Sequence, residues 1–241
     1  MALGAIVDVE SLSPFELTHV LYDGSSTKSE LAAFITLSPI LLMPVYAGII
    51  VKTRELTVIN MMLGQLANDV FNHILKYTIK QERPQAGLLG DTYGFPSSHS
   101  QYMAYFATFL LLHLSSRHTF ASYGAGLRWL DLLQRGALYA GILLWSFGVA
   151  FSRYFLHYHT VEQVVAGYMI GIFSGATYFF LTEPARSTSA AAKWRNAFLD
   201  SWFAQYWRIR DGWMVYKDGG VEEEYLDWRR RRDATLKVKA E

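Results

Sequence analysis

The chain has 241 residues, of which 51% are hydrophobic and only 18% charged, whereas soluble domains carry about 25% charged residues. Its net charge of +1 gives no support to a nucleic-acid partner. The chain has no cysteine, which excludes disulfides, iron–sulfur clusters and thiolate zinc sites. Long uncharged stretches precede a charged C-terminal region, a distribution typical of a multi-span membrane protein with a polar tail.

Five segments are apolar and long enough to cross a bilayer, which takes roughly 20 residues. They cover residues 31–51, 56–76, 99–116, 136–152 and 160–182. Pro39 and Pro44 predict a kink in the first segment. The fifth has small residues at the spacing of close helix contacts, namely Ala166, Gly167, Gly171, Gly175 and Ala176. The sequence therefore predicts an all-α fold, a polytopic membrane helical bundle with about five transmembrane helices.

The connections between these segments predict which side of the membrane each one faces. Residues 52–55, residues 117–135 and the tail carry Lys and Arg outside any motif, so the positive-inside rule places them in the cytoplasm. The 77–98 loop, the 153–159 turn and the N-terminus then face a lumen or the exterior. The N-terminus is acidic and lacks a basic segment before an apolar run, so we expect no signal peptide.

This topology divides the chain into three regions. We expect a lumenal N-terminal segment at 1–30, a transmembrane domain at 31–182 and a cytoplasmic amphipathic and basic tail at 183–241. Tryptophan and arginine are interleaved in the tail. That pattern favours either a segment lying on the membrane surface or a small lid on the bundle, and the sequence does not decide between them.

A polar stripe follows one face of the second predicted span. It consists of Gln65, Asn68, Asp69, Asn72 and Lys76, at steps of three or four residues. Polar groups facing lipid are costly, so we expect the stripe to face the bundle interior. We expect Gln65 and Asn72 to form hydrogen bonds between helices. Lys76 differs, because it lies at the C-terminal end of this predicted span, on the same side of the membrane as the motifs described next.

Three short motifs fall on one side of the membrane in the five-span topology. They are Lys76 to Arg83-Pro84, then Pro96-Ser97-Ser98-His99, and then Ser152-Arg153 followed after five residues by His159. Their residue types suit phosphoryl transfer. Arginines offer paired N–H donors to phosphate oxygens and lysine adds a point charge, while the first N–H groups of a helix attract an anion. One histidine can attack phosphorus, and the other can protonate the leaving oxygen.

The motifs resemble the signature of the phosphatidic acid phosphatase type 2 superfamily, which runs K-x6-R-P, P-S-G-H and S-R-x5-H-x3-D. The resemblance implies that His159 is the nucleophile and His99 the general acid. It implies phosphate binding by Lys76, Arg83, Ser97, Ser98 and Arg153. Three fixed cations can stabilise the transition state, so we expect neither a metal nor another cofactor.

Two positions depart from the superfamily pattern. Ser98 replaces the glycine of the second motif, and Gln163 replaces the aspartate that orients the nucleophilic histidine. Glutamine can accept a hydrogen bond from a ring N–H but supplies no charge. Asp69, Glu162 or a backbone carbonyl are alternatives for the missing carboxylate.

The departures resemble the dolichyl diphosphate phosphatase branch of the superfamily, through P-S-S-H-S-Q and S-R-x-x-x-x-Y-H-T-x-x-Q. The similarity extends to Thr18-His19-Val20, Leu37-Ser38-Pro39, Arg54-Glu55-Leu56 and Ile209-Arg210-Asp211. It implies cleavage of a long-chain polyprenyl (dolichyl) diphosphate to the monophosphate. It also implies an active site on the lumenal face of the endoplasmic reticulum membrane, where the reaction recycles dolichol for protein N-glycosylation.

Three alternatives share the same residues. The substrate could be phosphatidic acid, a sphingoid phosphate or a shorter prenyl diphosphate; the enzyme could be a lipid phosphotransferase; or the chain could be an inactive scaffold, which only Gln163 favours. We expect His157 to be a solvent-exposed turn residue rather than a second proton donor, and His73 to be structural. We expect His113 and His118 to lie far from the site. The sequence leaves the oligomeric state open.

Overall fold

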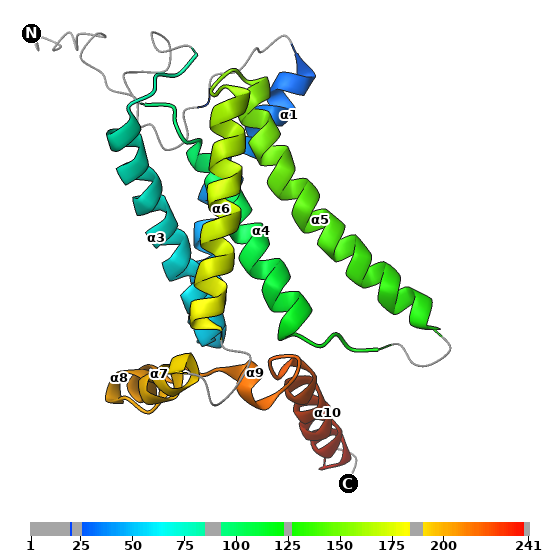
Figure 1. Ribbon diagram of the computed structural model, residues 1–241. Helices are drawn as coiled ribbons and strands as arrows, with labels where there is room; N and C mark the ends of the chain where they lie inside the picture. Colours follow the sequence, from blue (N-terminus) through cyan, green and yellow to red (C-terminus); the bar gives the residue numbers. More distant parts are fainter. Residues whose placement is uncertain (1–19, 21–25, 85–92, 123–126, 184–189, 239–241) are drawn as a thin grey trace, which may run out of the picture.

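The computed structural model describes residues 20, 26–84, 93–122, 127–183 and 190–238, and within these ranges the regular structure is helical. The helices are α1 Thr27–Thr36, α2 Ser38–Thr53, α3 Leu56–Ile79, α4 Ser98–Ser116, α5 Arg128–Phe155, α6 Val161–Thr182, α7 Ala190–Leu199, α8 Trp202–Trp207, α9 Gly212–Val215 and α10 Val221–Val238. Helices α1 to α6 form a bundle, and α7 to α10 lie at one end of it (Figure 1). The prediction of an all-α membrane bundle is confirmed.

The first predicted span is divided into α1 and α2 by Leu37. Pro39 has no N–H to donate, so it is tolerated in the first turn of α2 but could not continue a helix from α1. The hydroxyl of Ser38 donates to the carbonyl of Ile35 at 2.6 Å across the break. The interruption expected from the prolines therefore occurs at the first of them, whereas Pro44 lies inside α2.

Helix α4 lies at the centre of the bundle and packs most closely against α6. A side chain at Gly167 or Gly171 would come within 2.5 and 2.3 Å of backbone carbonyls of Ser97 and Gln101, respectively. One at Gly175 would meet the carbonyl oxygen of Tyr105 at 2.9 Å. The glycines of α6 therefore allow the backbones of α4 and α6 to approach closely, as their spacing predicted.

The polar stripe of α3 binds α4 and α6. Asn72 donates to the side chain of Gln101 at 2.7 Å, and Gln101 donates to the side chain of Asn68 at 2.9 Å. Gln65 donates to the backbone carbonyl of Tyr102 at 3.2 Å. Hydrogen bonding between helices therefore explains these three buried members of the stripe. Asp69 departs from the expectation, since its side chain is 47% exposed.

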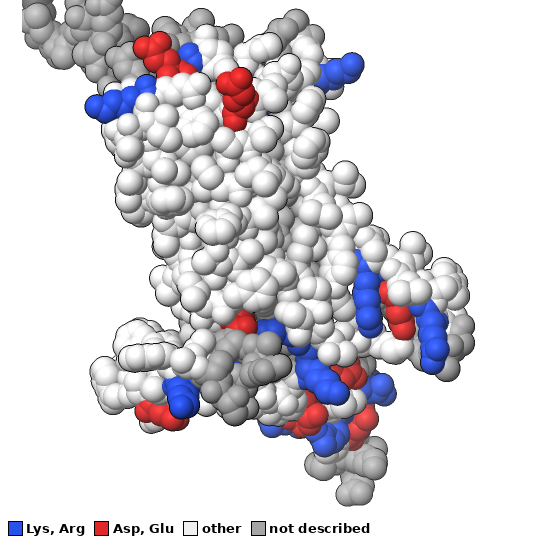
Figure 2. Space-filling model, viewed as in Figure 1, with Lys and Arg blue, Asp and Glu red and all other residues white. Residues whose placement is uncertain are grey.

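The outer surface of the bundle suits a bilayer. Within the described ranges, Thr27–Thr53, α5 and α6 are each long and apolar enough to cross a membrane. Charged side chains gather at the two ends of the bundle, and the band between them is uncharged on the visible face (Figure 2). The protein is a multi-pass membrane protein. Helices α3 and α4 run beside these three with 24 and 19 residues, and the count of five crossings stays a prediction.

Helix α5 is longer at both ends than the predicted fourth span, residues 136–152. It begins at Arg128, so Arg128 and Arg135 belong to the helix rather than to the preceding loop. It ends at Phe155, so Arg153 lies in its last turn rather than in the 153–159 turn. Hydropathy alone placed both boundaries too far inward, because charged residues occupy the two ends of the helix.

The C-terminal helices are attached to the bundle by buried ion pairs. Arg117, at the end of α4, binds the carboxylate of Glu183 and lies 3.1 Å from that of Asp211. Arg195 reaches Asp211 at 3.2 Å. The side chains of Glu183 and Asp211 are each only 2% exposed. Buried charges require such partners, so this cluster fixes the position of the tail.

Two segments more than 150 residues apart meet at the same end. The N–H of Leu56 donates to the carbonyl of Arg210 at 2.8 Å, and the N–H of Arg210 donates to that of Arg54 at 3.0 Å. Glu55 is buried, pairs with Arg210 at 2.6 Å and accepts the N–H of Gly212 at 2.8 Å. The chain around α9 is therefore docked on the bundle, which favours the lid alternative for this part of the tail.

Candidate active site

The three motifs meet at the end of the bundle opposite the tail. The end of α3 supplies Lys76, the start of α4 supplies His99, the end of α5 supplies Arg153, and the α5–α6 connection supplies His159 (Figure 1). Together with Arg83, these groups interact electrostatically with one another. Their positions in the sequence span more than 80 residues, and the fold brings them to one place.

His159 is only 2% exposed, and its ring is held by Gln163 one turn later on α6. Its Nδ1 lies 3.1 Å from Oε1 of Gln163. The same amide is fixed by two backbone groups, because its Nε2 donates to the carbonyl of Glu82 at 2.9 Å and its Oε1 accepts the N–H of Thr160 at 3.3 Å. A carbonyl can only accept and an N–H can only donate, so the amide has one orientation.

That orientation decides the tautomer of His159. Oε1 of Gln163 is an acceptor, so Nδ1 of the histidine carries the proton and donates it. The Nε2 atom of the neutral ring then has a free lone pair. Neither Asp69 nor Glu162 is needed for this arrangement, since Gln163 itself occupies the position that the superfamily aspartate takes in the motif.

Arg153 is buried, with 4% of its surface exposed. One terminal nitrogen donates to Oγ1 of Thr36 on α1 at 3.1 Å, and the guanidinium lies 3.9 Å from the ring centre of Tyr158. Its Nε is buried without a hydrogen-bond partner among the described residues. A buried donor left open in this way is costly unless an anion completes its bonding.

The site carries an excess of positive charge. Within the described ranges, neither Lys76 nor Arg153 forms an ion pair with a carboxylate. The ammonium of Lys76 donates to the hydroxyl of Ser98 at 3.5 Å. Burial holds the pKa of His159 well below its ordinary value, and the charges of Arg153, Arg83 and Lys76 lower it further. The imidazole is therefore neutral at physiological pH, and an anion is the ligand that this field favours.

The N-terminus of α4 points into this group. Ser97 precedes the helix, and no side chain among the described residues caps it, so the first N–H groups of α4 are open to an anion. Ser97 itself departs in part from the expectation. It is fully buried, its N–H donates to the carbonyl of Gln163 at 3.0 Å, and its hydroxyl accepts from Ser100 at 2.9 Å. Ser98 and His99 are the half-buried residues at this helix start.

Three participants escaped the sequence-based prediction. Thr36 is fully buried and accepts from both Arg153 and Ser152. Tyr158 stacks on Arg153. Gly94 faces the amide of Gln163, where an added side chain would come within 2.7 Å of Nε2. The sequence feature that could have indicated a role for Thr36 is its hydroxyl inside an apolar segment. No feature of the sequence indicated a role for Gly94.

Four histidines were expected from the sequence to have no catalytic role, and the structure shows where they lie. His157 is exposed, with φ of 57°, and His73 is an exposed residue of α3 that contacts Asp69. His113 and His118 belong to the opposite end, where the ring of His113 packs edge-on against Trp213 at 4.5 Å. His113 and His118 therefore lie far from the motif residues, and the side chains of His157 and His73 are exposed.

Comparison with known proteins agrees with the motifs. The family model of the PAP2 superfamily matches residues 57–186, which is more than half of the chain. The chain belongs to the PAP2 superfamily. The match starts near the beginning of α3 and includes every motif residue described above, together with α4, α5 and α6.

Comparison with individual proteins shows which members of the PAP2 superfamily the chain is similar to. The chain is 37% identical over 177 residues to a dolichyldiphosphatase of Saccharomyces cerevisiae, covering 70% of each chain. It is 36% identical over 178 residues to dolichyldiphosphatase 1 of Homo sapiens, covering 72% of this chain and 73% of the relative. A crystal structure of a transmembrane PAP2-type phosphatidylglycerolphosphate phosphatase from Bacillus subtilis matches with a TM-score of 0.53 and 21% identity, over 66% of this chain and 79% of that one. That likeness concerns the fold alone.

Proposed function

We propose that this PAP2-superfamily protein hydrolyses dolichyl diphosphate to dolichyl monophosphate and inorganic phosphate. The observation that carries the proposal is the position of His159, which is buried, neutral and held by Gln163 among cationic side chains from separate motifs. The dolichyldiphosphatases among its relatives support the choice of a polyprenyl diphosphate as substrate. The product would re-enter the dolichol cycle of protein N-glycosylation.

In the first step, Nε2 of His159 attacks the terminal phosphorus. A P–N bond forms, and the bond from that phosphorus to the bridging oxygen breaks. His99 donates a proton to the departing lipid phosphate. Lys76, Arg83, Arg153 and the first N–H groups of α4 hold the non-bridging oxygens, whose charge they stabilise most strongly in the transition state. The hydroxyl of Ser98 is within reach of Lys76 and completes this group.

In the second step, water attacks the phosphohistidine. His99, now neutral, accepts a proton from the water as the P–O bond forms and the P–N bond breaks. Inorganic phosphate leaves, and both histidines return to their starting states. Gln163 acts on His159 in both steps, because it keeps the proton on Nδ1 and the lone pair on Nε2. Ser97 would act through the backbone contact between the start of α4 and Gln163.

Phosphate release from defined lipids by the purified full-length chain tests the substrate. Dolichyl diphosphate is expected to be hydrolysed faster than phosphatidic acid, a sphingoid phosphate or farnesyl diphosphate. The rate should be unchanged in excess chelator, since the proposed scheme routes no step through a metal. Equal rates across the panel would favour a broad lipid phosphatase, strict dependence on an added divalent metal would contradict the scheme, and transfer to an added acceptor lipid would reveal a phosphotransferase.

We also propose that the site faces the lumen of the endoplasmic reticulum and that residues 183–241 form a cytoplasmic region. The support is the basic character of the opposite end, to which Arg128, Arg135 and the run 229–232 belong. In this arrangement the docked tail and the catalytic pocket lie on opposite membrane surfaces, and residues 31–182 contain the pocket.

Cysteine accessibility checks the orientation, because the chain has no cysteine of its own. Glu162→Cys lies on the exposed surface of the site end, and Asp200→Cys lies on that of the tail. In sealed microsomes, a membrane-impermeant maleimide should label Asp200→Cys at once and Glu162→Cys only after permeabilisation. Both variants should retain phosphatase activity, and the reverse order of labelling would place the active site in the cytoplasm.

A further inference from the structure

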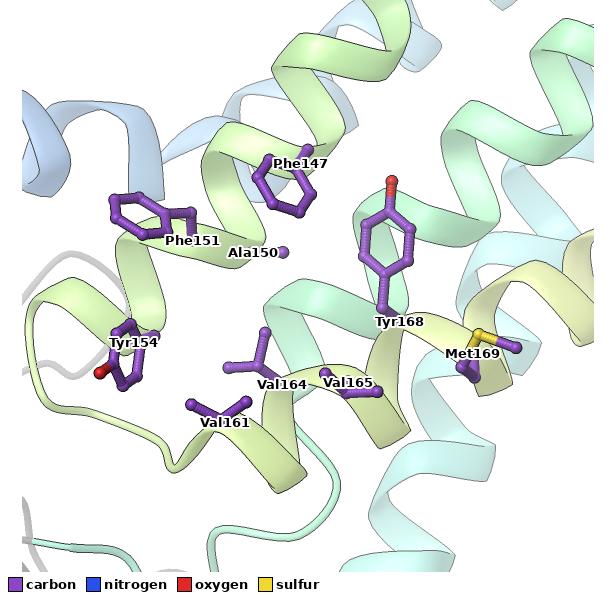
Figure 3. A pocket seen from close by; sticks show the side chains of 9 residues that line it. All are labelled: Phe147, Ala150, Phe151, Tyr154, Val161, Val164, Val165, Tyr168 and Met169. Atoms are coloured by element: carbon purple, nitrogen blue, oxygen red, sulfur yellow. The ribbon is translucent and has the colours of Figure 1, made fainter.

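An apolar groove lies between α5 and α6, beside the motif residues but outside them (Figure 3). Its volume is about 260 Å³. It is lined by Phe147, Ala150, Phe151 and Tyr154 of α5 and by Val161, Val164, Val165, Tyr168 and Met169 of α6. No lining residue carries a charge, so the groove cannot bind the phosphate groups themselves.

The groove results from the divergence of two helices joined by a short connection. Helices α5 and α6 are close together at the connection, and α5 then slants away from α6 along the bundle (Figure 1). The lining side chains recur every three or four residues on each helix, so two apolar faces oppose each other across the gap. Ser146 donates to the hydroxyl of Tyr168 at 3.1 Å, which joins the helices about two turns from the connection.

The groove begins next to the motif residues, because two of its lining residues are close neighbours of Arg153 and His159 in the chain. Tyr154 follows Arg153 directly on the last turn of α5, where Arg153 is buried and Tyr154 is 46% exposed. Val161 follows His159 by two residues at the start of α6, where His159 is buried and Val161 is 54% exposed. Neighbouring residues thus face the phosphate site on one side and the groove on the other.

We infer that the groove holds the first isoprene units of the substrate chain, next to the diphosphate. This inference rests on the proposed function and adds to it the part of the protein that selects the lipid. The groove extends about 12 Å along α6, from Val161 to Met169, at 1.5 Å per residue. It is smaller than the roughly 300–1,000 Å³ of sites that enclose a whole small molecule. It therefore accommodates the start of a chain, and the remainder lies in the bilayer.

The energetics of a bilayer determine what such a groove can do. Lipid tails are as apolar as the groove, so moving an isoprenoid from the membrane into it gains packing but little hydrophobic free energy. Aromatic rings and a methionine adapt to a branched, unsaturated chain. The groove should therefore affect the choice of chain and the position of the diphosphate more than the overall affinity for membranes.

Filling the groove tests the inference. Val165→Trp places a large ring among the lining residues, and Val45→Trp makes the same change on α2 at nearly equal exposure, 53% against 51%. We expect Val165→Trp to lower kcat/KM for dolichyl diphosphate by about tenfold, because the bound chain can no longer pack in the groove. Tenfold corresponds to a loss of transition-state stabilisation of about 1.4 kcal/mol. Its kcat/KM for methyl diphosphate, which has the same reacting group and no chain, should stay within twofold of wild type, and Val45→Trp should match wild type on both substrates.

The outcomes separate this inference from the proposed function. Hydrolysis of methyl diphosphate but not of dolichyl diphosphate by the wild type would overturn both. If the wild type hydrolyses dolichyl diphosphate but Val165→Trp loses activity equally on both substrates, the inference about the groove is wrong and the proposed function stands. If the oligomeric size of Val165→Trp changes as well, the groove is occupied by a second copy of the chain.

Photolabelling of the wild type does not depend on the folding of any variant. A dolichyl diphosphate analogue with a diazirine in its first isoprene unit should label residues within 147–169. Labelling confined to α2 or α3 would place the chain elsewhere and contradict the inference.

Discussion

His159→Ala is expected to abolish phosphate release from dolichyl diphosphate, with a loss of roughly 10³-fold or more in kcat. In the proposed mechanism this side chain forms the covalent bond to phosphorus, and no other described histidine shares its contact with Gln163. The loss should fall on kcat rather than on substrate binding, because the cationic groups stay in place. Phosphate release under single-turnover conditions, followed by trapping of phosphohistidine on the wild-type protein, measures this directly.

Two controls distinguish a lost nucleophile from a damaged fold. His159 is nearly fully buried, so its replacement by alanine leaves a space next to the phosphate site. Added imidazole should enter this space and restore part of the activity, which a collapsed site would not allow. His157→Ala removes an exposed neighbouring histidine and should stay close to wild type. Full activity of His159→Ala would exclude the proposed mechanism.

Gln163→Leu is expected to lower kcat by about 10²-fold or more, because in the proposed mechanism Gln163 acts through His159. Leucine removes the acceptor for Nδ1 of His159 and leaves the carbonyl of Glu82 without its amide donor. The imidazole then populates the tautomer with the proton on Nε2, which has no lone pair for the attack. Loss of the correct tautomer is among the most damaging single changes in histidine-dependent catalysis. Thermal stability in detergent serves as the control for folding.

Gln163→Glu separates a positioning role from a packing role through the pH profile. In the wild type, burial and nearby cations hold the pKa of His159 well below its ordinary value, so the neutral nucleophile persists into acidic solution. A carboxylate beside Nδ1 favours the charged imidazole and raises this pKa. The acidic limb of kcat/KM should therefore move to higher pH than in the wild type. A profile identical to that of the wild type would show that residue 163 does not act on His159.

Local patterns predicted much of the fold. Apolar segments of sufficient length, glycines at close-packing intervals and a proline near residue 37 each express a preference of nearby residues, and each is found in the bundle. The positions of the helix ends were predicted less accurately than the presence of the helices. The boundaries of α5 were misplaced because Arg128 and Arg153 lower the local hydropathy although both lie in the helix.

The site shows the same division. The sequence predicted Lys76, Arg83, His99, Arg153 and His159 as site residues, because phosphoryl transfer requires cations and histidines and the three motifs contain them in order. The structure brings these five residues together, and their catalytic roles stay a prediction. The sequence left the partner that orients His159 open between Gln163, Asp69, Glu162 and a backbone carbonyl. That question depends on which atom lies 3.1 Å from Nδ1, a distance that spacing along the chain does not contain.

The sequence by itself determined the membrane class, the order of the helices, the type of chemistry and the family. Composition and motif spacing are enough for these, because they depend on residue types and on neighbours within a few turns. Only the tertiary structure showed that Thr36 binds Arg153 from 117 positions away, that the tail docks on the bundle through Arg117 and Asp211, and that an apolar groove begins beside His159. Each of these depends on the path of the whole chain, since the partners come together only when distant helices pack.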